Sequence, residues 1–218
     1  ASSDALVLDS DESLKIYREA EDEFGDSSFL IVTYEPQNEL FSDYSLNRIA
    51  NLENDLKNIN GVDSVLSILD APIFFQPRVG LTDVADNLKD LTDENIDLEL
   101  AREEIINNPI YKELIISKDG KVTAMQVVLR GNDEYDELIS ERYEILDSLS
   151  SKEVLSHKNK TELQNRLNQI NERISELNNQ ESEFSKLLIS DIRNTLNKYK
   201  DEATIYLGGP SMIATDMM

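Results

Sequence analysis

The side chains that most often carry out chemistry are scarce in this sequence. Its 218 residues include one histidine, His157, and no cysteine. A single imidazole without a thiolate cannot complete a tetrahedral zinc site or form a Cys–His catalytic pair. His157 stands in the polar stretch Ser156–Lys160, where we expect a solvated loop. No serine lies in a Gly-x-Ser-x-Gly elbow. The sequence therefore predicts that the chain is not an enzyme.

Carboxylates are abundant, but their spacing identifies no site. There are 44 Asp and Glu residues, so pairs of acids arise by chance and do not indicate acid–base catalysis. Asp9-Ser10-Asp11 begins like a calcium loop, yet Leu14 stands where that loop needs glycine. Gly208-Gly209-Pro210 lacks the lysine and following helix of a phosphate loop. We expect no metal and no cofactor, and a small hydrolase is the least favoured alternative.

Charge and composition exclude further classes. Lys and Arg number 21, which leaves a formal net charge of −23. Such a field repels phosphate backbones, so we expect no nucleic-acid partner. The hydrophobic content of 39% is typical of a globular chain of one or two domains. No run approaches the ~18 apolar residues of a membrane-spanning helix.

One loop is a candidate for contact with a hydrophobic ligand. Ile73, Phe74 and Phe75 stand between Pro72 and Pro77. Two adjacent phenylalanines in an extended segment point to opposite faces, so we expect one of them to be accessible. These three residues form our predicted substrate-binding site. The alternative is that the loop covers one end of a sheet.

The elements around this loop predict an α+β fold. We expect strands at Phe29–Tyr34, Val62–Ile68, Val122–Leu129 and Ala203–Leu207, and a hairpin strand at Leu114–Ser117 joined through Asp119-Gly120. Helices are expected at 10–24, from Ser42 to Ile59, and at Leu98–Asn107. Without its long helical insertion, the order is that of a ferredoxin-like split βαβ plan, with helices on one face of an antiparallel sheet.

The stretch from Asp133 to Lys200 interrupts this plan. Apolar residues at helical spacing predict helices at Asp133–Leu149 and Thr161–Lys200, the second opened by a capping box at Thr161. We expect the two to pack antiparallel as a long helical hairpin. A core helix pair in an all-α protein is the alternative, but the strands on either side need one another as partners.

Three motifs resemble those of one family of membrane transporters. They are 60–67 (NGVDSVLS), 108–120 (from Asn108-Pro109 to Asp119-Gly120) and 206–213 (YLGGPSMI). Their order and spacing resemble the large extracytoplasmic loop of resistance–nodulation–division exporters, in the branch similar to the large mycobacterial membrane proteins. The resemblance extends from about Asp4 to Met218. It implies a porter domain of ferredoxin-like build between two transmembrane helices outside this chain.

This resemblance implies a function and a division of the chain. We expect residues 1–132 to form the first part of the porter domain, 133–182 the helical arm, and 183–218 the closing helix and strand. The domain would lie on the periplasmic face of the membrane and help a proton-driven exporter bind and pass lipids or other hydrophobic molecules. Its expected partners are that cargo, the transmembrane part of the same protein, and a second copy through the arm.

Two features limit what the resemblance implies. The arm is longer than the corresponding helix of drug-efflux members, so their trimer geometry and drug pocket do not carry over. The family's proton-relay acids lie in transmembrane helices, so none is assigned here. The alternative function is a free-standing adaptor that uses its coiled-coil-like arm to bind a partner.

Overall fold

The computed structural model describes residues 28–74, 89–93, 96–150, 157–209 and 212, and its fold is α+β. The described residues form two compact units, one of residues 28–130 with 188–212 and one of Gly131–Leu187. We call these the sheet unit and the arm unit. The predicted helix at 10–24 lies outside the described residues.

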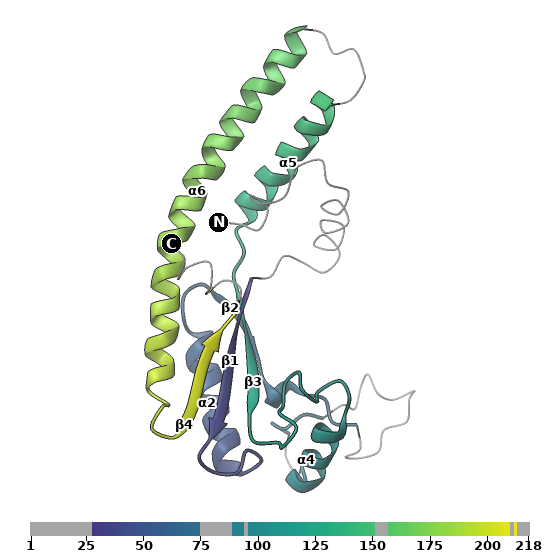
Figure 1. Cartoon of the computed structure of the whole chain (residues 1–218), viewed down its shortest axis with the longest axis vertical. Coiled ribbons are helices and arrows are strands. Elements are labelled where there is room, and N and C mark those ends of the chain that lie inside the picture. The colour runs from purple at the N-terminus through teal and green to yellow at the C-terminus, as the bar shows by residue number, and fades with distance from the viewer. Residues whose placement is uncertain (1–27, 75–88, 94–95, 151–156, 210–211, 213–218) are drawn as a thin grey trace. The chain divides into compact units, whose positions relative to one another are not determined.

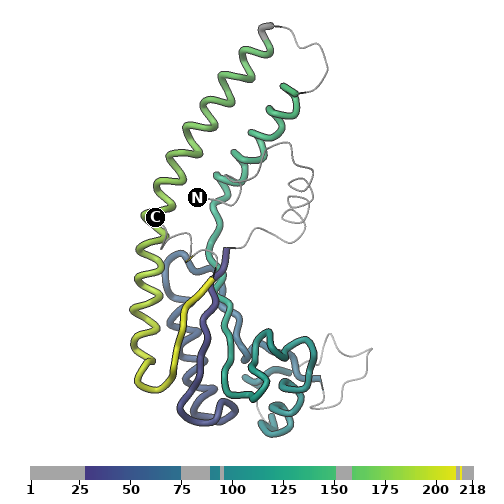
Figure 2. Tube along the Cα trace, in the orientation of Figure 1, coloured from purple at the N-terminus to yellow at the C-terminus, as the bar shows by residue number. Residues whose placement is uncertain are grey.

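The sheet unit is built on four antiparallel strands in the order β2-β3-β1-β4 (Figure 1). The strands are β1 (Phe29–Pro36), β2 (Val62–Leu66), β3 (Thr123–Leu129) and β4 (Ala203–Gly208). β4 pairs with β1, although the two stand at opposite ends of the described chain (Figure 2). The two strands that flank the helical insertion were expected to be partners, but β1 lies between β3 and β4. Val62–Ile68 was predicted as one longer strand, but β2 ends at Leu66 and the short helix η2 (Ile68–Asp70) follows.

Alternation along the strands places the core on one face of the sheet. In β1, Leu30, Val32 and Tyr34 are buried, and their neighbours in sequence point to the other face. Helix α2 (Asp43–Lys57) lies behind the sheet in Figure 1. The Ser42 side chain caps it as predicted, accepting a hydrogen bond from the Ser45 backbone N–H at 3.2 Å. The apolar side of α2 is fully buried, at Leu46, Ile49, Leu52 and Leu56.

The region between β2 and β3 departs from the predicted hairpin. Helix α4 (Leu98–Asn107) has the predicted bounds. Leu114–Ser117, however, forms no strand, and only an isolated bridge joins Ile116 to Thr123. The turn itself is present: Gly120 has φ 68°, and a Cβ there would collide with Ile106 of α4. The pairing beyond this turn is short: the Ser117 N–H donates to the Val122 carbonyl and the Ala124 N–H donates to the Ile115 carbonyl, both at 2.9 Å.

Two helices make up the arm unit, α5 (Asp133–Ser150) and α6 (His157–Asn197), whose last residues belong to the sheet unit. The predicted start of the second helix at Thr161 is wrong, because α6 already includes His157. No glycine or proline stands between His157 and Thr161, so the helix begins before the capping signal at Thr161. Ion pairs join the two helices: Glu134 to Arg173 at 2.6 Å and Glu141 to Arg166 at 2.5 Å.

The end of α6 completes the core of the sheet unit. Leu188, Ile192 and Leu196 of α6 are buried there, in continuation of the predicted stripe, and so is Tyr199 in the turn that follows. A short turn, in which the Glu202 N–H donates to the Tyr199 carbonyl at 3.1 Å, leads into β4. Among the helices that the structure describes, none is both long and apolar enough to cross a bilayer.

Candidate functional site

The predicted loop is held at its start by three different segments. The Ile73 N–H donates to the Lys89 carbonyl at 2.7 Å, and the Phe74 N–H donates to Glu104 Oε1 of α4 at 2.6 Å. The Tyr111 hydroxyl donates to the Pro72 carbonyl at 3.0 Å. These three hydrogen bonds therefore fix the position of the start of the loop.

The three predicted site residues have different surroundings. Ile73 is fully buried and belongs to the core, whereas Phe74 is half-buried. Phe75 lies outside the described residues. The substrate-binding role of this loop stays a prediction, and Ile73 contributes to it by anchoring the loop.

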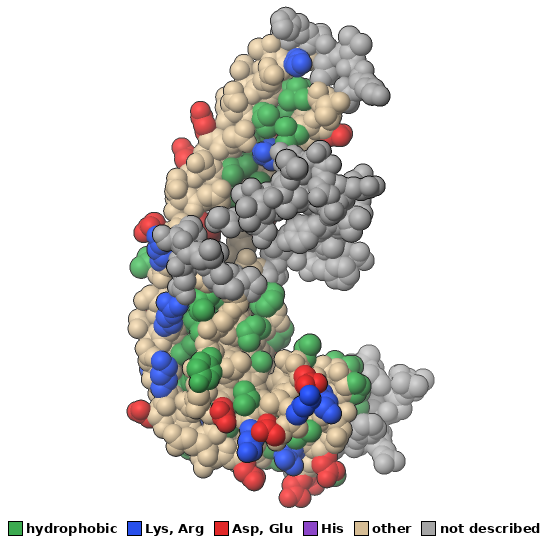
Figure 3. Space-filling model, viewed as in Figure 1, with side chains coloured by type: hydrophobic (Ala, Val, Ile, Leu, Met, Phe, Trp, Pro, Cys, Tyr) green, Lys and Arg blue, Asp and Glu red, His purple; other side chains and the backbone are tan. Residues whose placement is uncertain are grey.

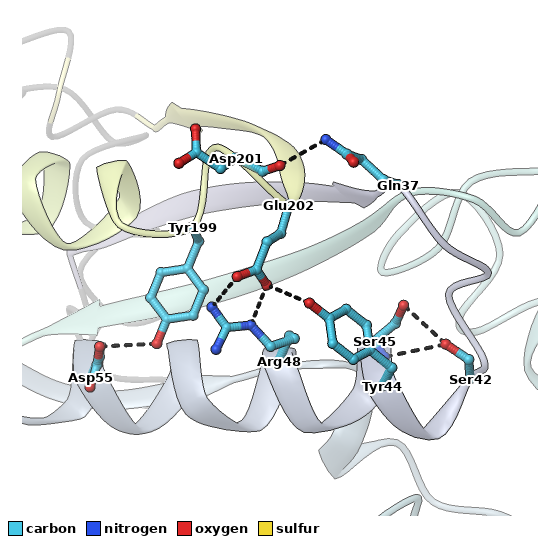
Figure 4. Close-up of polar contacts among 9 residues, drawn as sticks. All are labelled: Gln37, Ser42, Tyr44, Ser45, Arg48, Asp55, Tyr199, Asp201 and Glu202. Carbon is cyan, nitrogen blue, oxygen red and sulfur yellow. Dashed lines mark hydrogen bonds and ion pairs between the residues drawn. The ribbon is translucent and has the colours of Figure 1, made fainter.

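A polar cluster connects α2 with the turn before β4 (Figure 4). The Arg48 guanidinium pairs with both carboxylate oxygens of Glu202, at 2.5 Å and 3.0 Å, and lies 4.7 Å from the centre of the Tyr199 ring. Glu202 also accepts a hydrogen bond from the Tyr44 hydroxyl at 3.1 Å. A paired, bidentate arginine of this kind holds two elements in register. The cluster is therefore best explained as a structural contact that holds α2 to the turn before β4.

The tyrosines of this cluster are held in their neutral form. Burial, together with the 3.0 Å hydrogen bond that Tyr199 donates to Asp55, raises the pKa of Tyr199 to about 12. The hydrogen bond to Glu202 raises the pKa of Tyr44. Neutral phenols with carboxylate acceptors supply neither a nucleophile nor a base near neutral pH.

The face of the sheet opposite α2 is the most distinctive surface among the described residues. We call it the uncovered sheet face; Figure 1 shows it with no described helix in front of it. It consists of Phe29, Ile31, Thr33, Ser64, Leu66, Ala124, Gln126, Val128, Tyr206 and Gly208. Hydrophobic side chains gather over these strands in Figure 3.

Strand register arranges these residues in rows across the sheet. Ser64, Val128 and Phe29 form one row. Leu66, Gln126, Ile31 and Gly208 form the next, and Ala124, Thr33 and Tyr206 form a third. Cross-strand neighbours in such rows are in side-chain contact. The rows therefore form one continuous surface.

None of these ten residues is charged, in a chain of which 30% is charged. Charged side chains stand at the margins of the face, among them Glu35 near the end of β1, Asp63 in the β2 bulge and Arg130 after β3. Two of its apolar side chains are well exposed, Leu66 at 50% and Tyr206 at 69%. An uncharged face can be covered by an apolar group without the cost of desolvating a charge.

Metal and histidine chemistry find no support in the described part of the chain. His157 begins α6, so the loop predicted at this position is wrong. The described residues contain no cluster of three or more His, Cys, Asp or Glu side chains arranged to hold a metal ion.

Comparison of the chain with family models, with curated proteins and with solved structures gave no match.

Sequence reasoning missed both the uncovered sheet face and the polar cluster. The face was visible in the sequence only as uncharged residues at alternate positions of the four predicted strands, for example Phe29, Ile31 and Thr33. The cluster joins residues far apart in the chain, such as Arg48 and Glu202, and no local sequence pattern predicts such a contact.

Proposed function

We propose that the chain is the periplasmic porter domain of a proton-driven exporter of lipids or other hydrophobic molecules, of the resistance–nodulation–division type. The supporting observation is the strand order β2-β3-β1-β4 with the long helices entering between β3 and β4. This order matches a ferredoxin-like plan, which the family resemblance also implies. The domain binds and passes cargo and performs no catalysis itself.

The arm of this domain is an antiparallel helical hairpin. As residue numbers rise along α5 from Glu134 to Glu141, those of the partners in α6 fall from Arg173 to Arg166. Arg142 Nε also donates to Asn171 Oδ1 at 3.1 Å, and this pair lies within the same opposite-running series of partners. Opposite numbering of this kind is the mark of antiparallel packing.

The uncovered sheet face is the surface that contacts the cargo. Its ten uncharged residues offer an acyl chain or another neutral group a place to leave water. The strongly acidic remainder of the chain disfavours an anionic cargo. We also expect the loop residues Phe74 and Phe75 to contact the cargo, so Phe74→Ala and Phe75→Ala are expected to lower export while the fold is kept.

The location can be tested with a single cysteine, because the chain has none of its own. Lys118→Cys is suitable, since the Lys118 side chain is 69% exposed in a surface turn. A membrane-impermeant maleimide is applied to intact cells that express the whole protein. We expect labelling without permeabilisation. Labelling that appears only after the cells are opened contradicts the periplasmic placement.

Export itself is the second test. Cells expressing the intact protein are loaded with a neutral fluorescent lipid analogue, and its release is followed with and without a protonophore. We expect protein-dependent release that the protonophore abolishes. Equal release from cells with an empty vector overturns the proposal.

A free-standing adaptor is the second candidate, because the two arm helices leave several apolar side chains half-exposed, among them Ile139 and Leu146. The two candidates differ in membrane attachment. An exporter stays with the membrane after an alkaline wash, whereas a free-standing adaptor is released.

A further inference from the structure

The start of α6 carries a sequence motif for a covalent modification. Asn159-Lys160-Thr161 is an Asn-x-Thr tripeptide without proline in the middle, which is the acceptor signal for N-linked glycosylation. No other asparagine of the chain is followed two residues later by serine or threonine. The motif therefore defines a single candidate acceptor atom, Nδ2 of Asn159.

The surroundings of Asn159 leave room for a glycan. The four residues from Asn159 to Glu162 are all exposed, and Leu163, the next residue, is half-buried. Asn159 and Thr161 have interaction partners within the chain, and both remain at the surface with these partners in place. A bulky, strongly hydrated group attached to Asn159 therefore extends into solvent and displaces no core side chain.

The position of the motif within α6 suits transfer of a glycan. Helix α6 begins at His157, so Asn159 lies in its first turn. Side chains two residues apart point to opposite sides of a helix but to the same side of an extended segment. A transferase that engages both Asn159 and Thr161 therefore needs the tripeptide extended. The first turn of a helix opens most easily, because its backbone N–H groups have no partners within the helix.

The contacts that align the arm lie further along α6. The ion pair of Arg166 with Glu141 stands about two turns after Asn159, and the hydrogen bond from Arg142 to Asn171 about three turns after it. A glycan on Asn159 leaves both contacts in place. A glycan on Asn171 would instead displace the amide oxygen that binds Arg142. The motif thus stands where the arm tolerates the modification.

We propose that Asn159 is N-glycosylated and that a lipid-linked oligosaccharide is the donor. The inference rests on the proposed extracytoplasmic placement, because the modification belongs to chains exported across the membrane. In the transfer, Asn159 Nδ2 forms a bond to the anomeric carbon of the first sugar and loses one proton. The bond between that carbon and the phosphate oxygen of the lipid carrier breaks, and the lipid phosphate leaves with the electron pair. No oxidant or reductant takes part.

The test is mass spectrometry of the whole protein purified from its native cells. Cleavage after glutamate releases residues 154–162 as one peptide, because Glu153 and Glu162 bracket the motif with no glutamate between them. We expect this peptide to carry the added mass of a glycan and to give sugar fragment ions. Asn159→Gln and Thr161→Ala are each expected to abolish the added mass.

Two matched variants keep the acceptor signal. Thr161→Ser retains a hydroxyl two residues after Asn159 and is expected to retain the glycan. Asn165→Gln changes an exposed asparagine of the same helix that belongs to no such motif, and it is expected to leave the glycan in place. Loss of the glycan with Asn159→Gln and Thr161→Ala but not with these two variants assigns the site.

An unmodified peptide 154–162 in the unaltered protein overturns the proposal. A glycan that survives Thr161→Ala also overturns it, because the sugar is then attached without the acceptor signal. Maleimide labelling of Lys118→Cys in the same cells separates this failure from failure of the proposed function. Labelling from outside with an unmodified peptide refutes the glycosylation alone, whereas an unmodified peptide with labelling only in opened cells refutes both.

Discussion

The sheet unit and the arm unit are built from similar side chains but bury them to different extents. In the sheet unit, a sheet face and two helices enclose Leu30, Ile49, Leu52 and Ile192 completely. In the arm unit only three apolar side chains are buried among the described residues: Ile145, Ile170 and Leu177. Two helices meet along a line, whereas a sheet with helices meets over an area. Stability therefore resides in the sheet unit, and the arm depends on whatever else packs against it.

The same contrast holds for charges. The Arg48–Glu202 pair of the sheet unit is about two-thirds buried, with side-chain exposures of 27% and 33%, and a tyrosine ring lies against the guanidinium. The Glu134–Arg173 and Glu141–Arg166 pairs of the arm are exposed to solvent. Solvent and salt screen such pairs, so they set the alignment of the helices more than their stability.

The largest expected effect is on the unfolding free energy, when a buried isoleucine is shortened to alanine in each unit. Ile49 of α2 and Ile170 of α6 are both fully buried. Ile49→Ala is expected to cost about 3–4 kcal/mol of unfolding free energy, because it opens a cavity in the enclosed core. Ile170→Ala is expected to cost clearly less, because a two-helix arm can close over the gap. Urea unfolding measures both; equal costs would show that the arm is as well enclosed as the sheet unit.

The ion pairs give the next effect. Glu202→Gln is expected to cost about 1–2 kcal/mol, since the Arg48 guanidinium stays half-buried without its carboxylate. Glu134→Gln in the arm is the matched control and is expected to leave the unfolding free energy unchanged. Thermal unfolding in low and high salt compares the two. A larger loss from Glu134→Gln than from Glu202→Gln contradicts the contrast between the units.

A smaller effect is expected in alkali. The pKa of Tyr199 is raised to about 12 from the ordinary 10.0, so the folded state favours the protonated phenol. The stability from this group is fully present below pH 10 and is lost as the pH rises from 10 to 12. Tyr199→Phe is expected to flatten that part of the pH profile of unfolding. An unchanged profile means that Tyr199 titrates alike in the folded and unfolded chain.

The smallest effect concerns metals. We expect EDTA to leave the thermal midpoint unchanged at ordinary salt, because the chain has one histidine and no cysteine, and neither unit has a predicted calcium loop. A fall of several degrees would reveal a cation site among the acids.

Local patterns in the sequence predicted most of the elements. Ser42 was recognisable as a cap, the apolar and β-branched run of β1 as a strand, and the apolar stripe through Leu196 as a helix, although α6 ends at Asn197 rather than at the predicted Lys200. These features depend on residues close in the chain. The strand predicted at Leu114–Ser117 is wrong, because a turn signal at Asp119-Gly120 predicts the turn but not how far the segments on either side of it pair. The predicted start of α6 was wrong, because a capping signal has little effect within a continuous helix-forming stretch.

The candidate surface was harder to predict than the fold. A sheet face is exposed when no other element packs on it, and the sequence of the strands does not show this. The residues next to Leu66 and Tyr206 in the sequence do not distinguish these side chains from buried ones. The loop at Ile73 attracted attention because its apolar residues are consecutive. Its first residue, Ile73, donates its N–H to the Lys89 carbonyl, and the N–H of Phe74 donates to Glu104. No periodicity in the sequence encodes these long-range contacts.

The most direct test of the proposed cargo surface places a charge on the uncovered sheet face of the intact protein. Leu66→Asp is the variant, and Leu100→Asp on α4 is its control, because the two leucines are 50% and 53% exposed. Neither change is expected to alter the fold. The rate of protonophore-sensitive release of the neutral lipid analogue is the measurement. We expect Leu66→Asp to lower it strongly and Leu100→Asp to leave it unchanged; normal release with Leu66→Asp, or an equal loss with both, contradicts the proposal.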